Sequence, residues 1–413
     1  MSADIVWLLL CAALVLFMTP GLAFFYGGLV KVKSVVSMMM LSFGALALIG
    51  VLWVLYGFNI NSITNTSADW IPGVFGNPFS DFALANADGT TMAGAAFGST
   101  FAIITVALIS GAIADRAKFG SWMIFAGIWA TISYFPIAGW VWAVDADGNM
   151  SGWIGTLGEA LFPGSELEVL DWAGGTAVHI NAGAAALALA LVLGKRVVFE
   201  KGSSKPHNVP LVMLGAAILW FGWFGFNTGA ATDDNTAGLI FLNTVVTPAA
   251  GVLGFIAVER FKEGKATSVG AASGAVAGLV AITPACAALT PGWAIVLGLL
   301  AGAVCAFAID LKFRLGFDDS LDVVGLHLVA GFIGCLFLGF FATGTGLFTG
   351  GDFRQLVLQL LPAVAVAIYS FVVAWVIGTI IEKTIGFRIK NEDEVAGIDT
   401  SIHGETGYAL VEN

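Results

Sequence analysis

The residues that decide the fold occupy positions 173–193 and read AGGTAVHINAGAAALALALVL. The stretch carries no Asp, Glu, Lys or Arg, and it matches the roughly 20 apolar residues that a helix needs to cross the hydrocarbon core of a membrane. Its only ionisable side chain is His179. An ionisable residue inside a membrane-spanning helix indicates a functional site, because burying such a group in hydrocarbon is unfavourable.

The composition indicates that the rest of the chain shares this environment. Of 413 residues, 58% are hydrophobic and 11% are charged, whereas about 25% of residues are charged in a soluble domain. A soluble protein must show polar surface to water, so a membrane is the expected solvent. The net charge of −11 argues against a nucleic-acid partner. Four cysteines lie in apolar runs without C-x-x-C spacing, so we expect no metal site and no cofactor.

Eleven apolar stretches predict an all-α polytopic membrane protein. They lie at 5–26, 36–58, 94–114, 121–143, 172–194, 209–228, 238–259, 268–288, 292–310, 322–345 and 355–382. The stretch 209–228 has the weakest pattern, because Gly222, Gly225 and Gly229 interrupt it.

The basic residues predict the orientation. Of the 17 Lys and Arg residues, all except Arg354 fall in alternate loops or just after the last span. Basic residues gather in cytoplasmic loops, so we expect the N-terminus outside and the C-terminus in the cytoplasm. Residues 1–383 would form the transmembrane domain. The polar tail 384–413 would pack on the cytoplasmic loops.

A short internal repeat connects two distant spans. The segments Val178–Gly183 and Leu326–Gly331 both begin with an aliphatic residue and His and end in Ala-Gly. Each follows an aspartate, Asp171 in the first case and Asp322 in the second. The two segments fall in the fifth and tenth predicted spans.

This spacing predicts an inverted repeat. A five-helix unit that recurs after an odd number of helices must insert upside down, and the site of such proteins lies between the repeats near the membrane midplane. The expected halves are about 1–200 and 205–345, with a last helix at 355–382. Two matched histidines favour a shared function over two separate hydrogen bonds to backbone carbonyls. Bis-histidine haem ligation is a further alternative, although diheme chains generally contain more histidine.

At these residues the chain resembles the ammonium transporter family (Amt/Mep/Rh), bacterial Amt-type, over essentially its whole length. The motifs that carry the resemblance are Pro20–Gly28, Asp171–Asn181 continuing to Gly194–Arg196, Trp223–Asn227, Asp322–His327, and Gly397–Asp399 followed by His403–Glu405. The resemblance implies two inverted five-helix halves plus a last helix, assembled as a homotrimer in the cell membrane with one pore per subunit. The tail motif implies docking of a PII-type signalling protein. No enzymatic activity is implied.

The resemblance also implies an aromatic entrance to the pore. Phe101 and Phe226 match the stacked phenyl gate, and Trp142 with Phe101 matches the outer ammonium site. Two positions depart from the family pattern. Ala230 stands where many members have a serine, and Gly139 stands where many have a histidine. Because Ala230 lacks the hydroxyl acceptor, the affinity of the outer site would rest on Trp142, Phe101 and backbone carbonyls.

Deeper in the pore, the resemblance implies that His179 and His327 line the lumen and that Trp223 packs beside them. Asp171 and Asp322 would support the structure without touching the substrate. A shared bond between two neutral imidazoles leaves one donor and one acceptor for the lumen. Such a pair could orient ammonia or relay a proton, because histidine titrates nearest to physiological pH.

Energetics favour ammonia in a dry pore. A charge in hydrocarbon costs from roughly 3 to well over 10 kcal/mol. Loss of a proton at pH 7 from an amine with a pKa of about 10.4 costs about 4.6 kcal/mol. Alkali cations have no proton to lose. We therefore expect transport of ammonium, or of methylammonium as an analogue. The alternatives are an ammonium sensor that signals through its tail, and a Rhesus-like electroneutral gas channel.

Overall fold

The computed structural model describes residues 2–201 and 205–408, and these residues form a bundle of helices without a β-sheet. Ten helices among them are long and apolar enough to cross a membrane. Ser268–Ile282 (α11) is a shorter apolar helix of 15 residues at the place of the eighth predicted span. The chain is therefore an all-α polytopic membrane protein, as its sequence predicts.

The first five spans contain several short helical segments. The α-helices are α1 (Ala3–Leu29), α2 (Val35–Leu52), α3 (Phe58–Asn61), α4 (Gly89–Ile109), α5 (Phe119–Trp129), α6 (Phe135–Trp142), α7 (Leu157–Leu161) and α8 (Asn181–Leu193). The 3-10 and π-helical turns between them are η1 (Val32–Ser34), η2 (Trp53–Gly57), η3 (Phe82–Leu84), η4 (Ser110–Ile113), η5 (Ala130–Tyr134) and η6 (Gly175–Ile180).

The remaining spans and the tail follow in the same manner. Their α-helices are α9 (Val209–Thr228), α10 (Asp234–Glu263), α11, α12 (Pro291–Ala308), α13 (Leu311–Leu315), α14 (Val329–Phe341), α15 (Phe353–Thr384) and α16 (Asn391–Ala396). The π-helical turns are η7 (Val324–Leu328) and η8 (Asp399–His403). The eighth span was expected over 268–288, but α11 ends at Ile282. Pro284 follows closely, and proline cannot continue the hydrogen-bond ladder of a helix.

The stretch 209–228, which has the weakest apolar pattern of the predicted spans, is an unbroken helix, α9. Its glycines face α1. A Cβ at Gly215 would meet the backbone of Phe25, and a Cβ at Gly222 would meet Met18 within 2.2 Å. Small residues let helix backbones approach closely in lipid, so Gly222 and Gly225, which thin the apolar pattern, allow α1 and α9 to pack, whereas Gly229 lies against Phe97 of α4.

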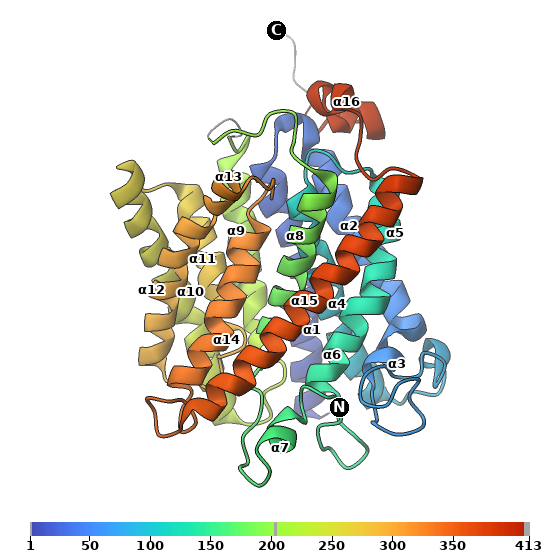
Figure 1. The fold of residues 1–413 in the computed structure, drawn as a ribbon, viewed down its shortest axis with the longest axis vertical. Helices are drawn as coiled ribbons and strands as arrows, with labels where there is room; N and C mark the ends of the chain where they lie inside the picture. Colours follow the sequence, from blue (N-terminus) through green and yellow to red (C-terminus); the bar gives the residue numbers. More distant parts are fainter. Residues whose placement is uncertain (1, 202–204, 409–413) are drawn as a thin grey trace.

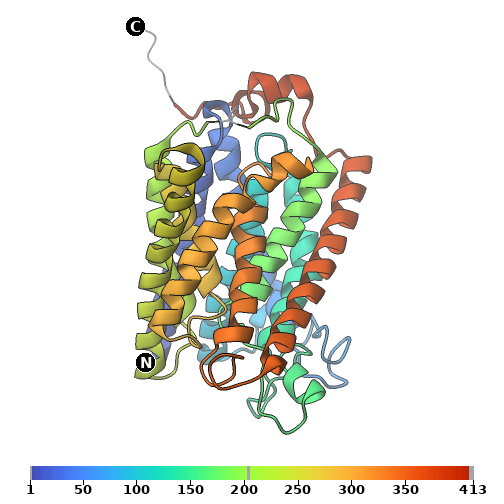
Figure 2. The same cartoon turned by 60° about the vertical axis from the view of Figure 1, so that its left-hand side comes forward.

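Figures 1 and 2 show the spans lying side by side, with the long helix α15 crossing the bundle obliquely. α15 packs on α8, and α1 packs on α9. Contacts within the first five spans recur in the next five: α1 with α4 matches α9 with α11, and α4 with α8 matches α11 with α14. This pattern agrees with two related halves. Their inverted relationship stays a prediction.

The tail lies at the opposite end of the bundle from α7 and the start of α1 (Figure 1). It packs on the basic loops. The Asp399 carboxylate accepts hydrogen bonds from the amides of Val36 and Ser37, and the Ile389 amide donates to the Arg116 carbonyl. Residues 409–413 of the expected tail lie outside the described residues. The side of the membrane on which this end lies stays a prediction.

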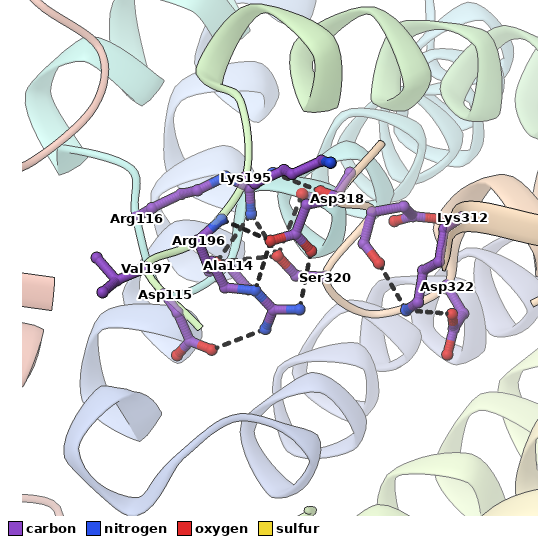
Figure 3. Close-up of polar contacts among 12 residues, drawn as sticks. Ala114, Asp115, Arg116, Lys195, Arg196, Val197, Lys312, Asp318, Ser320 and Asp322 are labelled. Carbon is purple, nitrogen blue, oxygen red and sulfur yellow. Dashed lines mark hydrogen bonds and ion pairs between the residues drawn. The ribbon is translucent and has the colours of Figure 1, made fainter. Parts of the chain in front are cut away.

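Beneath the tail, a buried ionic cluster joins loops from the two halves of the chain (Figure 3). The Arg196 guanidinium donates two hydrogen bonds of 2.9 Å to Asp318, and it lies 3.2 Å from the Asp115 carboxylate. Arg116, also buried, donates to the Ser320 hydroxyl and to the Asp318 carbonyl. Buried charges persist only where they are paired in this way, so the cluster fixes these loops against each other.

Candidate functional site: a histidine pair between two cavities

The two membrane-buried histidines meet in the centre of the bundle. His179 lies in η6 and His327 in η7, each a single π-helical turn at the start of a span. Their Nδ1 atoms are 3.2 Å apart, and the ring centroids are 5.3 Å apart. π-helical turns are rare and occur frequently at functional sites. The structure thus brings together the residues that the repeat singles out.

The bond between the two Nδ1 atoms constrains both rings. In a neutral pair, one Nδ1 donates its hydrogen and the other accepts it, so one Nε2 is left bare and the other carries a hydrogen. His179 Nε2 is buried and has no hydrogen-bond partner among the described residues. Buried polar atoms normally have partners, so an unpartnered ring nitrogen indicates a place for a small polar molecule.

Asp171 positions the first histidine. The chain turns at Gly174 with φ of 110°, a conformation that glycine adopts without strain. One Asp171 carboxylate oxygen then accepts hydrogen bonds from the Thr176 and Ala177 amides at 3.1 and 3.0 Å, which satisfies the start of η6. Burial raises the pKa of Asp171 to about 6, and these amides act against the rise. The supporting role expected for Asp171 agrees with this geometry.

The counterpart of Asp171 in the second half is Asp319, although the internal repeat in the sequence predicts Asp322 at this place. The Asp319 carboxylate accepts hydrogen bonds from the Val323 and Val324 amides at 3.1 and 2.7 Å. Burial raises the pKa of Asp319 to about 6. Asp322 instead pairs with Lys312 at 2.6 Å and is partly exposed.

A signal for Asp319 was present in the sequence. His327 follows Asp319 by eight positions, and His179 follows Asp171 by the same number. Asp322 belongs to the DVVGLH motif that contains His327, but it is only five positions before the histidine.

The aromatic residues matched to the gate lie beside the histidines. The Phe101 and Phe226 rings are stacked, with centroids 4.1 Å apart and an angle of 18° between their planes. The Trp142 ring meets Phe101 edge-on at 6.1 Å, and its Nε1 donates to the Asp171 carbonyl. Trp223 stacks on His179 at 5.4 Å. Thr283, which sequence reasoning missed, holds Trp223 by accepting a hydrogen bond from its Nε1.

On one side of the stacked rings lies a cavity of about 510 Å³, here called the aromatic cavity. Phe101, Trp142, Phe226 and Ala230 line it, as the resemblance implies. Gly139 does not line it, because a Cβ there would meet Ile63 and the Asn61 carbonyl. Further aromatic residues of this cavity, which sequence reasoning did not name, are Trp53, Phe58, Phe97, Tyr134 and Trp172.

On the other side of the rings lies the histidine cavity, which has a volume of only about 10 Å³. It is lined by the two histidines and by apolar side chains that include Leu22 and Val276. Such a volume holds about one water molecule. A haem is far too large for this space, so the arrangement does not fit bis-histidine haem ligation.

Towards the tail, the same helices reach a third cavity of about 210 Å³, the polar cavity. α1 contributes Leu22 to the histidine cavity and Leu29 to the polar cavity, and α11 contributes Val276 and then Val269. Charged side chains also line the polar cavity; they include Asp115, Arg196, Asp310, Lys312 and Asp322. The histidine cavity is therefore the smallest of the three, and α1 and α11 run from it towards the polar cavity.

Comparisons with known proteins agree with this arrangement. A family model described as the Ammonium Transporter Family matches residues 6–408. The chain is 49% identical over 439 residues to an ammonium transporter of Mycobacterium tuberculosis, covering 98% of this chain and 90% of the relative. It is 42% identical over 421 residues to an ammonium transporter of Bacillus subtilis, covering 98% of each chain.

Solved structures have the same fold. One described as a sensor Amt protein superposes with a TM-score of 0.85 at 26% identity, covering 96% of this chain and 97% of that one. Mep2 of Saccharomyces cerevisiae superposes with a TM-score of 0.83 at 32% identity, covering 94% of this chain and 88% of that one.

Proposed function

Because this chain belongs to the ammonium transporter family and is a membrane-embedded protein, we propose that it transports ammonium through a pore inside its own helix bundle. The route runs from the aromatic cavity past Phe101 and Phe226 to the histidine cavity, and from there to the polar cavity. The observation that carries the proposal is the His179–His327 pair, whose Nδ1 atoms are 3.2 Å apart between two larger cavities.

The aromatic cavity would recruit the cation. Trp142 and Phe101 offer ring faces and edges there, and a cation over an aromatic ring gains about 0.5–2 kcal/mol, with the larger values in desolvated sites. No serine hydroxyl is available at Ala230, so ring faces and backbone carbonyls would supply the remaining contacts. The stacked Phe101 and Phe226 rings close the direct path, so passage requires them to move apart.

The narrow centre favours the neutral species. Placing a charge in a dry apolar site costs from roughly 3 to well over 10 kcal/mol, whereas release of a proton from an amine at pH 7 costs about 4.6 kcal/mol. With room for about one water molecule, the histidine cavity cannot hydrate a cation. Ammonium would therefore lose a proton before it enters, and the histidine pair would receive ammonia.

The histidine pair suits ammonia chemically. Ammonia can accept the hydrogen from the protonated Nε2 of one ring and donate a hydrogen to the bare Nε2 of the other. Potassium and sodium ions have no proton to release, and the histidine cavity is too small to hydrate them. Selectivity then follows from deprotonation, with little need for coordination specific to one ion.

Uptake measurements test the proposal. Expression of the chain in a host that lacks ammonium transport should give methylammonium uptake and growth on low ammonium. Uptake no higher than that of an empty vector, with the protein present in the membrane, would contradict the proposal.

Ammonium-evoked current in reconstituted vesicles identifies the net species. A current that scales with ammonium indicates transport of ammonium or of ammonia with a separately relayed proton. Uptake without current favours a Rhesus-like electroneutral gas channel. Comparison of the wild type with His179→Ala and His327→Ala then tests whether the pair carries the proton.

A second candidate, an ammonium sensor, is favoured by one solved relative and by the docked tail. The solved chain described as a sensor Amt protein shares the fold at 26% identity. Here the tail hydrogen-bonds with loops between the spans, so a change in the bundle could reach a partner protein. A His179→Asp variant that loses flux but keeps an ammonium-dependent signal would support the sensor role.

The assembly and the partner are also proposals. The resemblance implies a homotrimer in the cell membrane, with a pore in each chain, and a PII-type protein docked on the tail end. Light scattering of the purified protein should give three copies of the chain per particle. Co-purification with the host PII protein, abolished by deletion of residues 384–413, would identify the partner.

A further inference from the structure

A cavity of about 490 Å³ lies between the start of α5 and the tail, apart from the proposed pore. It is called the tail cavity here. Its wall carries one carboxylate, Asp393, three cationic side chains, Lys118, Arg388 and Lys390, and the imidazole of His403. Cations therefore outnumber carboxylates on this wall, in a chain whose net charge is −11.

The nearby carboxylates neutralise only part of this excess, because Glu394 pairs with Arg388 at 2.8 Å. Glu394 is occupied by Arg388 and by the Val197 amide. Glu382 accepts hydrogen bonds from the amides of Phe387 and Arg388. The remaining basic side chains, Lys118 and Lys390, form no ion pair among the described residues.

The wall also carries two nitrogen atoms without a hydrogen-bond partner among the described residues. These are Arg388 Nε and His403 Nε2, and both are buried. α5 begins at this wall without a side-chain cap, and its N-cap residue is Lys118. A cation beside a helix N-terminus is unfavourable, because the free amides there carry partial positive charge. An anion with several acceptor oxygens would relieve both conditions.

The position of the cavity indicates the source of that anion. Phe119 begins a membrane-spanning segment, and the span of α15 ends at Thr384. Ile385 and Ile402 are 54% and 41% exposed, which places apolar surface beside the basic wall. A mixture of exposed apolar and basic side chains is typical of the level of lipid head groups.

We propose that the tail cavity binds the phosphate group of an anionic phospholipid from the leaflet beside the tail. Lys118 and Lys390 supply the charge, and Arg388 and His403 supply further donors. The Lys118 amide already donates to the Phe387 carbonyl. A phosphate between Lys118 and Lys390 therefore holds the tail against α5. This proposal does not depend on the proposed transport.

Native mass spectrometry of the full chain in neutral detergent tests the proposal, with phosphatidylglycerol and phosphatidylcholine as probes. The wild type should retain phosphatidylglycerol more tightly than phosphatidylcholine. K118Q/K390Q should bind phosphatidylglycerol about thirtyfold more weakly, since each basic residue near an anionic head group contributes about fivefold. K390Q alone changes an exposed side chain that forms no ion pair among the described residues, and it should bind about fivefold more weakly.

K265Q is the matched control, because Lys265 is an exposed lysine that does not line this cavity. Equal weakening in K265Q, unchanged binding in K390Q, or equal retention of the two lipids by the wild type overturns the proposal. Inorganic phosphate forms a separate arm. If inorganic phosphate raises the unfolding temperature and phosphatidylglycerol does not, the assignment of the site to a lipid is overturned.

Discussion

Among the described residues, the His179 and His327 side chains have each other as hydrogen-bond partners, through Nδ1 atoms 3.2 Å apart. We predict that His179→Ala lowers methylammonium uptake by roughly 5- to 150-fold, the effect of about 1–3 kcal/mol for a buried polar group without its partner. Uptake at matched expression measures the effect. His207→Gln is the control, because His207 lies outside the spans. Equal loss in both variants would indicate general damage to the fold.

At the aromatic cavity, Ala230 stands where the resemblance to the family implies a serine hydroxyl. Ala230→Ser returns a hydroxyl acceptor to the wall of the cavity. A new hydrogen bond contributes about 0.5–1.5 kcal/mol, so we expect the KM for methylammonium to fall roughly two- to tenfold. Ala231→Ser, at a neighbouring position that does not line the cavity, should leave KM unchanged. An unchanged KM in Ala230→Ser would place recruitment elsewhere.

At the scale of the helical element, η6 and η7 each follow an aspartate whose carboxylate accepts hydrogen bonds from two backbone amides at the start of the turn. We predict that Asp319→Ala lowers the free energy of unfolding by about 0.5–2 kcal/mol, the usual loss on removal of an N-terminal cap. Uptake should fall as well, because η7 holds His327.

Asp322→Asn is the comparison for that prediction, since it removes the ion pair with Lys312 and asparagine tolerates the φ of 63° at this position. Lys312 is buried but keeps its hydrogen bond to the Asp319 carbonyl, so the variant loses one partly exposed ion pair, which contributes about 1 kcal/mol. Thermal unfolding in detergent should therefore rank Asp319→Ala as the more damaged variant. The opposite ranking would restore Asp322 to the supporting role.

For the whole molecule, Asp171 and Asp319 predict a dependence of stability on pH. Burial raises the pKa of each to about 6 from 3.8, so between these values the folded chain binds more protons than the unfolded chain. The stability that this protonation contributes is complete below about pH 4 and is lost as pH rises through about 6. Each shift in pKa corresponds to a contribution on the order of 3 kcal/mol to the free energy of unfolding at low pH.

The measurement compares unfolding temperatures of the wild type and Asp171→Asn from pH 4 to pH 7. Asparagine keeps an oxygen for the Thr176 and Ala177 amides but does not ionise. The variant should gain stability relative to the wild type as pH rises through about 6. A difference that stays constant with pH would show that Asp171 does not titrate in this range.

Much of the whole molecule follows from the sequence. Apolar length predicts the spans, because a membrane leaves the backbone few alternatives to a helix of about 20 residues. The all-α fold and the family are confirmed by the helices and by the comparisons. The orientation and the inverted repeat stay predictions, supported by the charge pattern and by the recurring contacts.

The tertiary structure decided which residues meet. Scarcity of ionisable groups identified His179 and His327, but only the fold places their Nδ1 atoms at 3.2 Å. It also moved the cap of η7 from Asp322 to Asp319, because the fold of the loop places the Asp319 carboxylate, and not that of Asp322, against the Val323 and Val324 amides. Likewise, Thr283 has no periodicity or spacing that marks it as the partner of Trp223. Local sequence sets the environment of each segment, whereas contacts between distant segments depend on how the helices pack.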